Sequence, residues 1–261
     1  MFTLQGKRAM VCGSTQGLGR GCAEELARAG AEIVLVARNE ETLEKTRDAL
    51  ATDHGQNHEF IVADFSDHAG VRESIRVHLD STSHVQILVN NTGGPPAGPA
   101  NEADPEAFLS AFKQHLLCNQ ALVQETLPGM KEAGYGRVIN IISTSVVIPV
   151  KGLGVSNTIR GAVANWARTL ASELAPFGIT VNNVLPGFFD TVRLHSIIAT
   201  KAGKMGVSVP EMEKQMQGTV PMERFGTPEE MGAVVAFLAS PGASYVNGVN
   251  LLVDGGRLAA S

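Results

Sequence analysis

Seven short apolar runs recur along the chain, with helical stretches between them. The runs span residues 9–12, 33–37, 60–63, 87–89, 138–142, 179–184 and 249–253. Short runs that are continuous, bounded by Gly, Asn or Asp, are typical of strands buried on both faces of a sheet. Because these strands alternate with helices, the pattern predicts a parallel, doubly wound sheet with helices on both faces.

Start signals place several helices between these runs. Asn39 precedes two glutamates, and residues 227–230 open an amphipathic stretch that runs to Leu238. A capping side chain followed by proline or acidic residues is a common start of a helix. No linker divides the chain. We therefore expect one α/β domain over residues 1–261, with a seven-stranded sheet in a three-layer sandwich.

Two stretches interrupt this alternation. Residues 93–105 are rich in Gly and Pro, and residues 191–223 look irregular apart from a helical patch that bears methionines. Both follow strands at their carboxyl ends, where open α/β sheets bind ligands, so we expect them to wall a substrate site, with 191–223 as a substrate-loop insertion. The wall residues are the apolar Phe188, Phe189, Leu194, Ile197, Ile198, Met205, Met212 and Met216, and the basic Arg193, His195 and Lys201, which could meet an anionic substrate group. The alternative for the apolar residues is that they pack this segment against the body of the protein as a lid. The alternative for the basic residues is that they are solvated charges.

Composition and charge narrow the function. The 261 residues include 44% hydrophobic and 18% charged residues, as in globular proteins, and the net charge of −5 disfavours a nucleic-acid partner. The first 16 residues hold only a short apolar run, too short for a signal sequence or membrane span. The three cysteines lack the spacing of a metal site or a disulfide framework. We expect no metal, no membrane association and a cytoplasmic location.

A glycine-rich turn follows the first apolar run and opens the first helical stretch. Glycines allow the backbone to turn tightly and to approach a pyrophosphate, whose charge is stabilised by amides at the start of the helix. The turn consists of Gly13, Ser14, Thr15, Gln16, Gly17, Leu18 and Gly19. Its position at the first junction of strand and helix predicts a Rossmann-type dinucleotide-binding domain.

The end of the second strand bears on the choice of dinucleotide. NAD sites usually have an acidic residue here for the ribose 2′-hydroxyl, whereas an arginine accommodates a 2′-phosphate. This chain has Ala37 followed by Arg38, which favours NADP(H) and leaves NAD(H) possible. Asp64 and Phe65 end the third strand. We expect them beside the adenine, with a turn-forming role for Asp64 as the alternative.

The motifs resemble those of the short-chain dehydrogenase/reductase family, especially its branch of 3-oxoacyl-carrier-protein reductase-like enzymes. The glycine turn looks like the family's cofactor loop, residues 90–93 resemble its Asn-Asn-Ala-Gly motif, and Pro186-Gly187 resembles its Pro-Gly turn. Residues 224–230 and 253–256 resemble its closing motifs. The resemblance spans essentially the whole chain and implies hydride transfer at the nicotinamide in a homotetramer or dimer. It implies cofactor contacts at Asn91, Thr92, Gly93, Ile141, Arg160, Pro186, Gly187, Phe189 and Thr191.

The chain departs from the family at the catalytic residues. The family has a serine ending the fifth strand, a tyrosine thirteen residues later, a lysine four residues further and an asparagine in the preceding helix. Ser143 matches the serine, but Ser156 and Arg160 stand in place of the tyrosine and the lysine. Neither of the two tyrosines lies near enough in sequence to take the missing role. His115 falls at the asparagine position, where a partly buried contact between subunits is the alternative.

These changes require different chemistry from that of the family. An arginine, with a pKa of roughly 12.5 or more, supplies charge but no proton. We expect Arg160 to hold the nicotinamide ribose and to stabilise the developing alkoxide, while Ser143 and Ser156 hydrogen-bond the substrate oxygen. The proton would come through water or from His115, because an ordinary histidine pKa of about 6.5 suits action near neutrality.

The leading hypothesis is an NADP(H)-dependent oxidoreductase that interconverts a carbonyl compound, 3-oxoacyl-like or other, and an alcohol. Its small-molecule substrate is not identified by the sequence. One alternative is a catalytically impaired sensor or regulatory subunit that binds NADP(H). Another is elimination or epimerisation, since a fold does not fix the reaction. The polar side chains of Ser143, Ser156 and Arg160 could order an oxyanion, which favours an enzyme over a binding protein.

Overall fold

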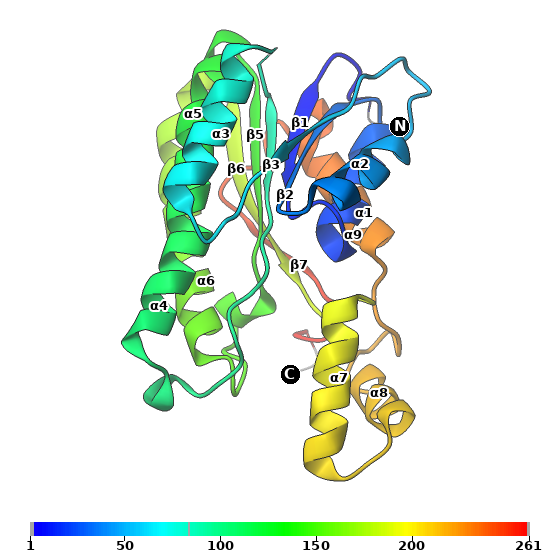
Figure 1. The fold of residues 1–261 in the computed structure, drawn as a ribbon. Helices are drawn as coiled ribbons and strands as arrows, with labels where there is room; N and C mark the ends of the chain where they lie inside the picture. Colours follow the sequence, from blue (N-terminus) through cyan, green and yellow to red (C-terminus); the bar gives the residue numbers. More distant parts are fainter. Residues whose placement is uncertain (1–2, 83, 260–261) are drawn as a thin grey trace.

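A parallel sheet runs through the middle of the molecule (Figure 1). The computed structural model describes residues 3–82 and 84–259, and in this part of the chain seven strands lie in the order β3-β2-β1-β4-β5-β6-β7. The strands are β1 (Arg8–Cys12), β2 (Glu32–Ala37), β3 (Glu59–Val62), β4 (Ile87–Asn90), β5 (Gly136–Ile141), β6 (Ile179–Pro186) and β7 (Asn250–Val253). The predicted doubly wound parallel sheet is confirmed, and each of the seven apolar runs overlaps one strand.

Helices cover both faces of the sheet. On one face lie α1 (Gly17–Arg28), α2 (Glu40–Asp48) and α9 (Pro228–Ala239), and on the other lie α3 (His68–Asp80), α5 (Cys118–Glu132) and α6 (Gly154–Leu174) (Figure 1). A shorter helix, α4 (Pro105–Phe112), joins α5 through the segment η2 (Lys113–Leu117), which has π-helical hydrogen bonding. The predicted caps are present: Asn39 accepts a hydrogen bond from the Thr42 amide, and Thr227 forms a capping box with Glu230.

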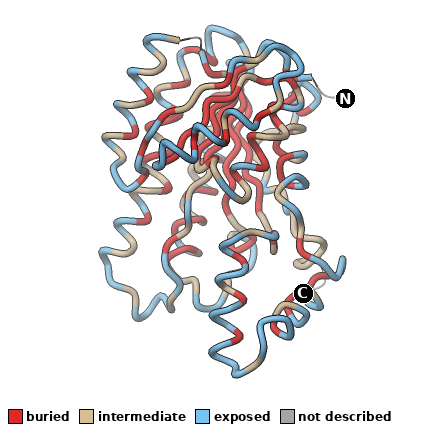
Figure 2. Tube along the Cα trace, turned by 45° about the vertical axis from the view of Figure 1, so that its right-hand side comes forward, coloured by how far each residue is buried: buried red, intermediate tan, exposed pale blue. Residues whose placement is uncertain are grey.

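The strands divide the core into two halves because successive side chains point to opposite faces. Ala9 and Val11 of β1 pack with α1 and α9, whereas Met10 and Cys12 pack with α3, α5 and α6. Both sets are fully buried. Figure 2 shows the buried residues concentrated along the strands. The continuous apolar runs in the sequence are thus explained by helices on both sides.

Four asparagines form a ladder across β4, β5, β6 and β7. The side-chain amide of Asn90 donates to Asn140 (2.8 Å), that of Asn140 to Asn183 (2.9 Å), and that of Asn183 to Asn250 (2.8 Å). The strand register places these four residues opposite one another. The first three are buried, so these hydrogen bonds satisfy groups that water does not reach.

The segment 191–223 is mostly helical, so the expectation of an irregular segment was wrong. It contains α7 (Val192–Met205) and α8 (Val209–Gln217), which pack against each other. Figure 1 shows the pair standing beyond the carboxyl ends of the strands. Leu194, Ile198, Met212 and Met216 form a small core of their own, while Met205 is exposed. Half of the eight predicted apolar wall residues therefore pack inside this helical pair.

Candidate active site

The sheet order reverses between β1 and β4, which are neighbours, and the turns that follow them meet there. The backbone of Gly13 has a φ of 59°, and a Cβ added to it would lie 2.7 Å from the carbonyl oxygen of Asn91. At Gly19 an added Cβ would lie 2.1 Å from the carbonyl oxygen of Gly13. Only glycine fits these positions. The carboxyl edge at such a reversal of strand order is where open α/β sheets bind dinucleotides.

The start of α1 is suited to an anion. No side chain caps this helix, and its first turn contains no acidic residue. Thr191, which caps α7, lies over the turn, since a Cβ at Gly17 would be 3.3 Å from its Cγ2. A Cβ at Gly93, by contrast, would meet nothing within 4 Å. The turn, the uncapped amides and the open space beside Gly93 fit a dinucleotide pyrophosphate.

Several predicted cofactor contacts have side chains that point elsewhere. Ser14 is fully buried, with its hydroxyl 3.5 Å from the carbonyl oxygen of Val36. Phe65 and Phe189 belong to the two halves of the core. The amide of Asn91 donates to the carbonyl oxygens of Cys12 (3.2 Å) and Gly13 (3.3 Å). These four side chains are therefore turned into the core or against the backbone of the turns.

Arg38 and Asp64 come together at the ends of β2 and β3. Arg38 is exposed. Asp64 accepts a hydrogen bond from the Ser66 amide (2.9 Å), the turn-forming role named as the alternative. That hydrogen bond, and to a smaller extent the charge of Arg38, lower the pKa of Asp64. An arginine at this place offers a free cation to a 2′-phosphate.

Ser143 and Ser156 come from the two segments that flank the loop after β5. Ser143 caps the short helix η3 (Thr144–Val146) by accepting a hydrogen bond from the Ser145 amide at 3.0 Å. Ser156 lies in the first turn of α6, and its hydroxyl has no hydrogen-bond partner among the described residues. Since α6 packs against η3, both hydroxyls are at the carboxyl edge of the sheet.

Arg160 is one turn further along α6 and is buried. Its Nη1 donates to the carbonyl oxygen of Ile141 at 3.0 Å, at the end of β5. No carboxylate of the described residues pairs with it. Burial, and then the charge of Arg193, lower the pKa of Arg160 to about 10, so it stays a cation at neutral pH. An isolated buried cation is unfavourable unless a ligand compensates it.

His115 lies in the π-helical segment η2, which packs against α6. Its Nδ1 is 2.6 Å from Oγ1 of Thr92, and its buried Nε2 has no hydrogen-bond partner in the part of the chain that the structure describes. Burial, with the charges of Arg160 and Arg193, lowers the pKa of His115 to about 3. A pKa this low leaves the imidazole neutral near pH 7, which favours water over His115 as the source of the proton. Segments of π-helix occur frequently at functional sites.

Arg193 joins this group from the first turn of α7. Its Nη1 donates to the carbonyl oxygen of Gly94 at 3.3 Å. The other two basic candidates are not in the site: His195 pairs with Asp190 (2.7 Å), and Lys201 is exposed on α7. The pairing of Thr92 with His115 was not predicted, because no spacing rule links a residue after β4 to one in the next helix.

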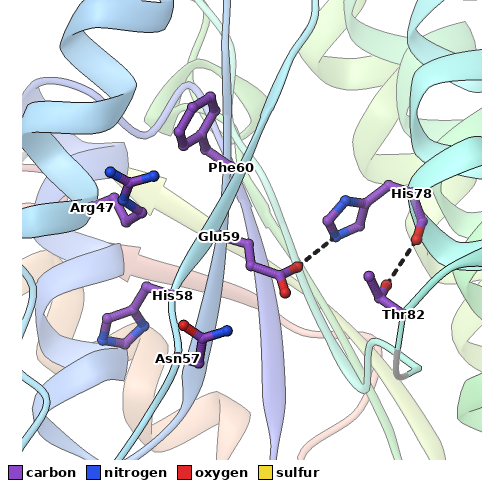
Figure 3. Close-up of a pocket in the computed structure, with 7 residues that line it drawn as sticks. All are labelled: Arg47, Asn57, His58, Glu59, Phe60, His78 and Thr82. Carbon is purple, nitrogen blue, oxygen red and sulfur yellow. Dashed lines mark hydrogen bonds and ion pairs between the residues drawn. The ribbon is translucent and has the colours of Figure 1, made fainter.

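A cleft lies at the amino ends of the strands, near the start of β3 (Figure 3). Glu59 pairs there with His78 (3.1 Å) and with Arg8. The cleft has a volume of about 400 Å³ and is lined by Arg47, Asn57, His58, Glu59, Phe60, His78 and Thr82. Since its central charges neutralise one another and it is far from the glycine turn, we do not assign it to the active site.

Two further features of the described residues bear on function. They contain no group of three or more His, Cys, Asp or Glu side chains arranged to hold a metal ion. None of their helices is long and apolar enough to cross a membrane.

Comparison with known proteins agrees with this geometry. The family model described as enoyl-(acyl carrier protein) reductase matches residues 13–257. The chain is 29% identical to the NADPH-dependent reductase BacG of Bacillus subtilis over 97% of this chain and 98% of that protein. It is 32% identical to the 3-oxoacyl-[acyl-carrier-protein] reductase FabG of Pseudomonas aeruginosa over 98% of each chain.

A solved structure shows the same architecture. L-Sorbose reductase from Gluconobacter frateurii, complexed with NADPH and L-sorbose, superposes with a TM-score of 0.92 at 29% identity over 98% of each chain. The match to the family model extends from the glycine turn to the closing residues after β7. With its sheet order and the glycine turn between β1 and α1, the chain belongs to the short-chain dehydrogenase/reductase family of nicotinamide-dependent oxidoreductases.

Proposed function

We propose that this protein is an NADP(H)-dependent reductase that interconverts a carbonyl compound and an alcohol without the family's tyrosine and lysine. The proposal rests on two neighbouring buried groups among the described residues. His115 has an Nε2 without a hydrogen-bond partner, and Arg160, whose charge acts on His115, is a cation that no carboxylate pairs with. The similar reductases that use NADPH support the choice of cofactor and reaction. The glycine turn and the uncapped start of α1 would hold the pyrophosphate, and Arg38 the 2′-phosphate.

When bound, NADPH supplies the hydride that reduces a carbonyl carbon. The chain's own groups then have to stabilise the negative charge on the carbonyl oxygen. Ser143 and Ser156 would donate hydrogen bonds to that oxygen, and the cation of Arg160 would lower the energy of the alkoxide. Arg160 is placed for this by its hydrogen bond to Ile141, which orients the guanidinium at the end of β5.

His115 would act as a neutral hydrogen-bond donor. If the Thr92 hydroxyl donates to Nδ1, the ring proton is on Nε2, the atom that lacks a partner. A neutral imidazole that donates to a carbonyl oxygen polarises it, as is known for other enzymes. The proton that completes the alcohol would then come from water, because the ring does not carry a second proton near pH 7.

We also propose a homo-oligomer, as a tetramer or dimer, in the cytoplasm. Leu109 and Phe112 are exposed apolar side chains on α4, which packs against α6. Exposed apolar residues grouped on one helix are common at subunit interfaces. The three cysteines are buried and unpaired, which suits a reducing compartment.

The proposal is tested by measuring cofactor binding and turnover together. Fluorescence titration gives the affinities for NADPH and NADH, and NADPH oxidation is then assayed with ketones, diketones and 3-oxoacyl thioesters. Turnover that falls in Ser156→Ala and Arg160→Met, but not in the control Thr158→Ala on the exposed side of α6, supports the proposal. Tight NADPH binding with no turnover, even in Ser156→Tyr with Arg160→Lys, would instead identify a binding or regulatory protein.

A further inference from the structure

The side chain of Arg193 reaches from helix α7 across to the loop after β4. Its Nη1 donates to the carbonyl oxygen of Gly94 at 3.3 Å. Its Nη2 lies so close above the same residue that a Cβ at Gly94 would be 2.7 Å away. Two residues before Gly94 is Thr92, the hydrogen-bond partner of His115. The guanidinium of Arg193 is therefore held against the loop that carries Thr92.

The charge of Arg193 has no counterpart within the described residues. The nearest acid in sequence, Asp190, pairs with His195. Arg193 also lies in the first turn of α7, and a cation is unfavourable at the amino end of a helix, where the dipole is positive. Its charge acts on both Arg160 and His115, lowering the pKa of each. Two guanidinium groups and a neutral imidazole thus act on one another in a region where the described residues place no paired carboxylate.

We propose that Arg193 binds an oxyanion group, a carboxylate or a phosphate, of the substrate whose carbonyl is held by Ser156 and His115. The proposal rests on the reductase function proposed above and names its substrate class. The planar fork of a guanidinium matches a carboxylate or phosphate with two hydrogen bonds. One donor to Gly94 fixes the side chain, and the remaining donors are left for a ligand.

A second source of an oxyanion is the pyrophosphate of the cofactor. Thr191, two residues earlier, lies over Gly17 of the glycine turn. Arg193 is directed instead to Gly94, on the side of Thr92 and His115. This difference in direction favours the substrate, and the experiment separates the two sources.

The experiment compares oxo acids with their uncharged methyl esters. The probes are 3-oxobutanoate, 4-oxopentanoate and 5-oxohexanoate, each assayed with NADPH beside its ester. The wild type should prefer at least one acid over its ester. Arg193→Gln should lower kcat/KM for that acid by about tenfold to a hundredfold, the usual effect of losing a charged hydrogen bond. The kcat/KM for the ester should change by less than about threefold. Arg193→Lys should be intermediate, and Lys204→Gln, exposed at the far end of α7, should match the wild type.

Binding measurements separate this proposal from failure of the proposed function. If no carbonyl compound turns over, the thermal midpoint of the NADPH-bound protein is measured with each acid and ester. A rise caused by the acids and lost in Arg193→Gln supports the anion site by itself. Equal responses to acids and esters overturn it. A tenfold weaker NADPH affinity in Arg193→Gln, without acid discrimination, also overturns it and assigns Arg193 to the cofactor.

Discussion

Oγ1 of Thr92 lies 2.6 Å from Nδ1 of His115, and this contact joins the loop after β4 to the π-helical segment before α5. It fixes the orientation of a ring that is otherwise surrounded by the core. The other ring nitrogen has no partner in the structure. A histidine that is buried, neutral and half-satisfied is suited to hydrogen-bond a ligand.

Stability should depend on pH through His115. The folded state lowers the pKa of this ring to about 3, whereas the unfolded chain takes up the proton at about 6.5. The unfolded state therefore binds more protons between these values, and the stabilisation present above about pH 6.5 is lost as the pH falls towards 3. The difference in unfolding free energy between wild type and His115→Asn should change by several kcal/mol over this window. Urea unfolding at a series of pH values measures it, and parallel curves for the two proteins would contradict it.

Turnover should not follow titration of His115. Because the ring is neutral throughout the range from pH 5 to pH 8, His115→Asn should lower kcat by a factor that is the same across this range. Cofactor affinity should be unchanged, since no contact of His115 involves the glycine turn. A kcat ratio that varies with pH near 6.5 would show a titrating imidazole instead.

Removal of the Arg160 charge should stabilise the ligand-free protein while impairing catalysis. The folded state lowers the pKa of this group to about 10. Keeping the guanidinium charged therefore costs about 3 kcal/mol more in the folded than in the unfolded state. Arg160→Met fills a similar volume without that cost, so its unfolding free energy should equal or exceed that of the wild type by about 1–3 kcal/mol. Its kcat should fall about a hundredfold or more through loss of alkoxide stabilisation. A clear loss of stability would mean that the hydrogen bond to Ile141 outweighs the charge.

Arg38→Ala should alter cofactor preference. Removal of the exposed cation at the end of β2 should weaken NADPH binding by about tenfold to a hundredfold, the usual effect of losing a charged hydrogen bond to a phosphate. NADH lacks the 2′-phosphate, so its affinity should change by less than about twofold. Fluorescence titration measures both constants, with Arg76→Ala on α3 as the control. Equal effects on the two cofactors would place the 2′-phosphate elsewhere.

Features that lie within one continuous stretch of sequence could be predicted. The glycine turn is one such stretch, and the strands of a buried sheet are marked by continuous apolar runs. Helix α7 could also have been found, since Leu194, Ile198 and Ala202 repeat at helical spacing behind the capping residue Thr191. Its regularity was obscured by the glycines near its end.

Features that depend on register or on contact between distant segments could not be predicted. Asn140 and Asn183 are poor strand formers by propensity, and nothing local shows that β5 and β6 bring them opposite each other. The lowered pKa of His115 likewise comes from burial beside charges on α6 and α7. The sequence alone offers only the unperturbed pKa of a histidine, because these charges lie far from His115 in sequence.

The asparagine ladder should contribute strongly to stability. Asn140→Leu removes the acceptor for Asn90 and the donor to Asn183, so two buried amide groups lose their partners. The expected cost is roughly 2–5 kcal/mol, measured by urea unfolding. Asn101→Ala, at an exposed position of the short helix η1 (Ala100–Glu102), is the control and should change stability by less than about 0.5 kcal/mol. A small effect of Asn140→Leu would mean that apolar packing of the leucine compensates for the lost hydrogen bonds of the ladder.

The cleft at the amino ends of the strands should add a second dependence of stability on pH. Burial lowers the pKa of His78, the charge of Glu59 opposes this effect, and the charge of Arg8 adds to it (Figure 3). The net direction is downward, so the unfolded chain protonates first and stability falls as the pH drops below about 6.5. His78→Gln should abolish this part of the dependence in urea unfolding. Glu59→Gln removes the group that raises the pKa, so an NMR titration of the His78 ring should give a still lower value. An increase in that variant would show that Glu59 acts mainly by burying the ring.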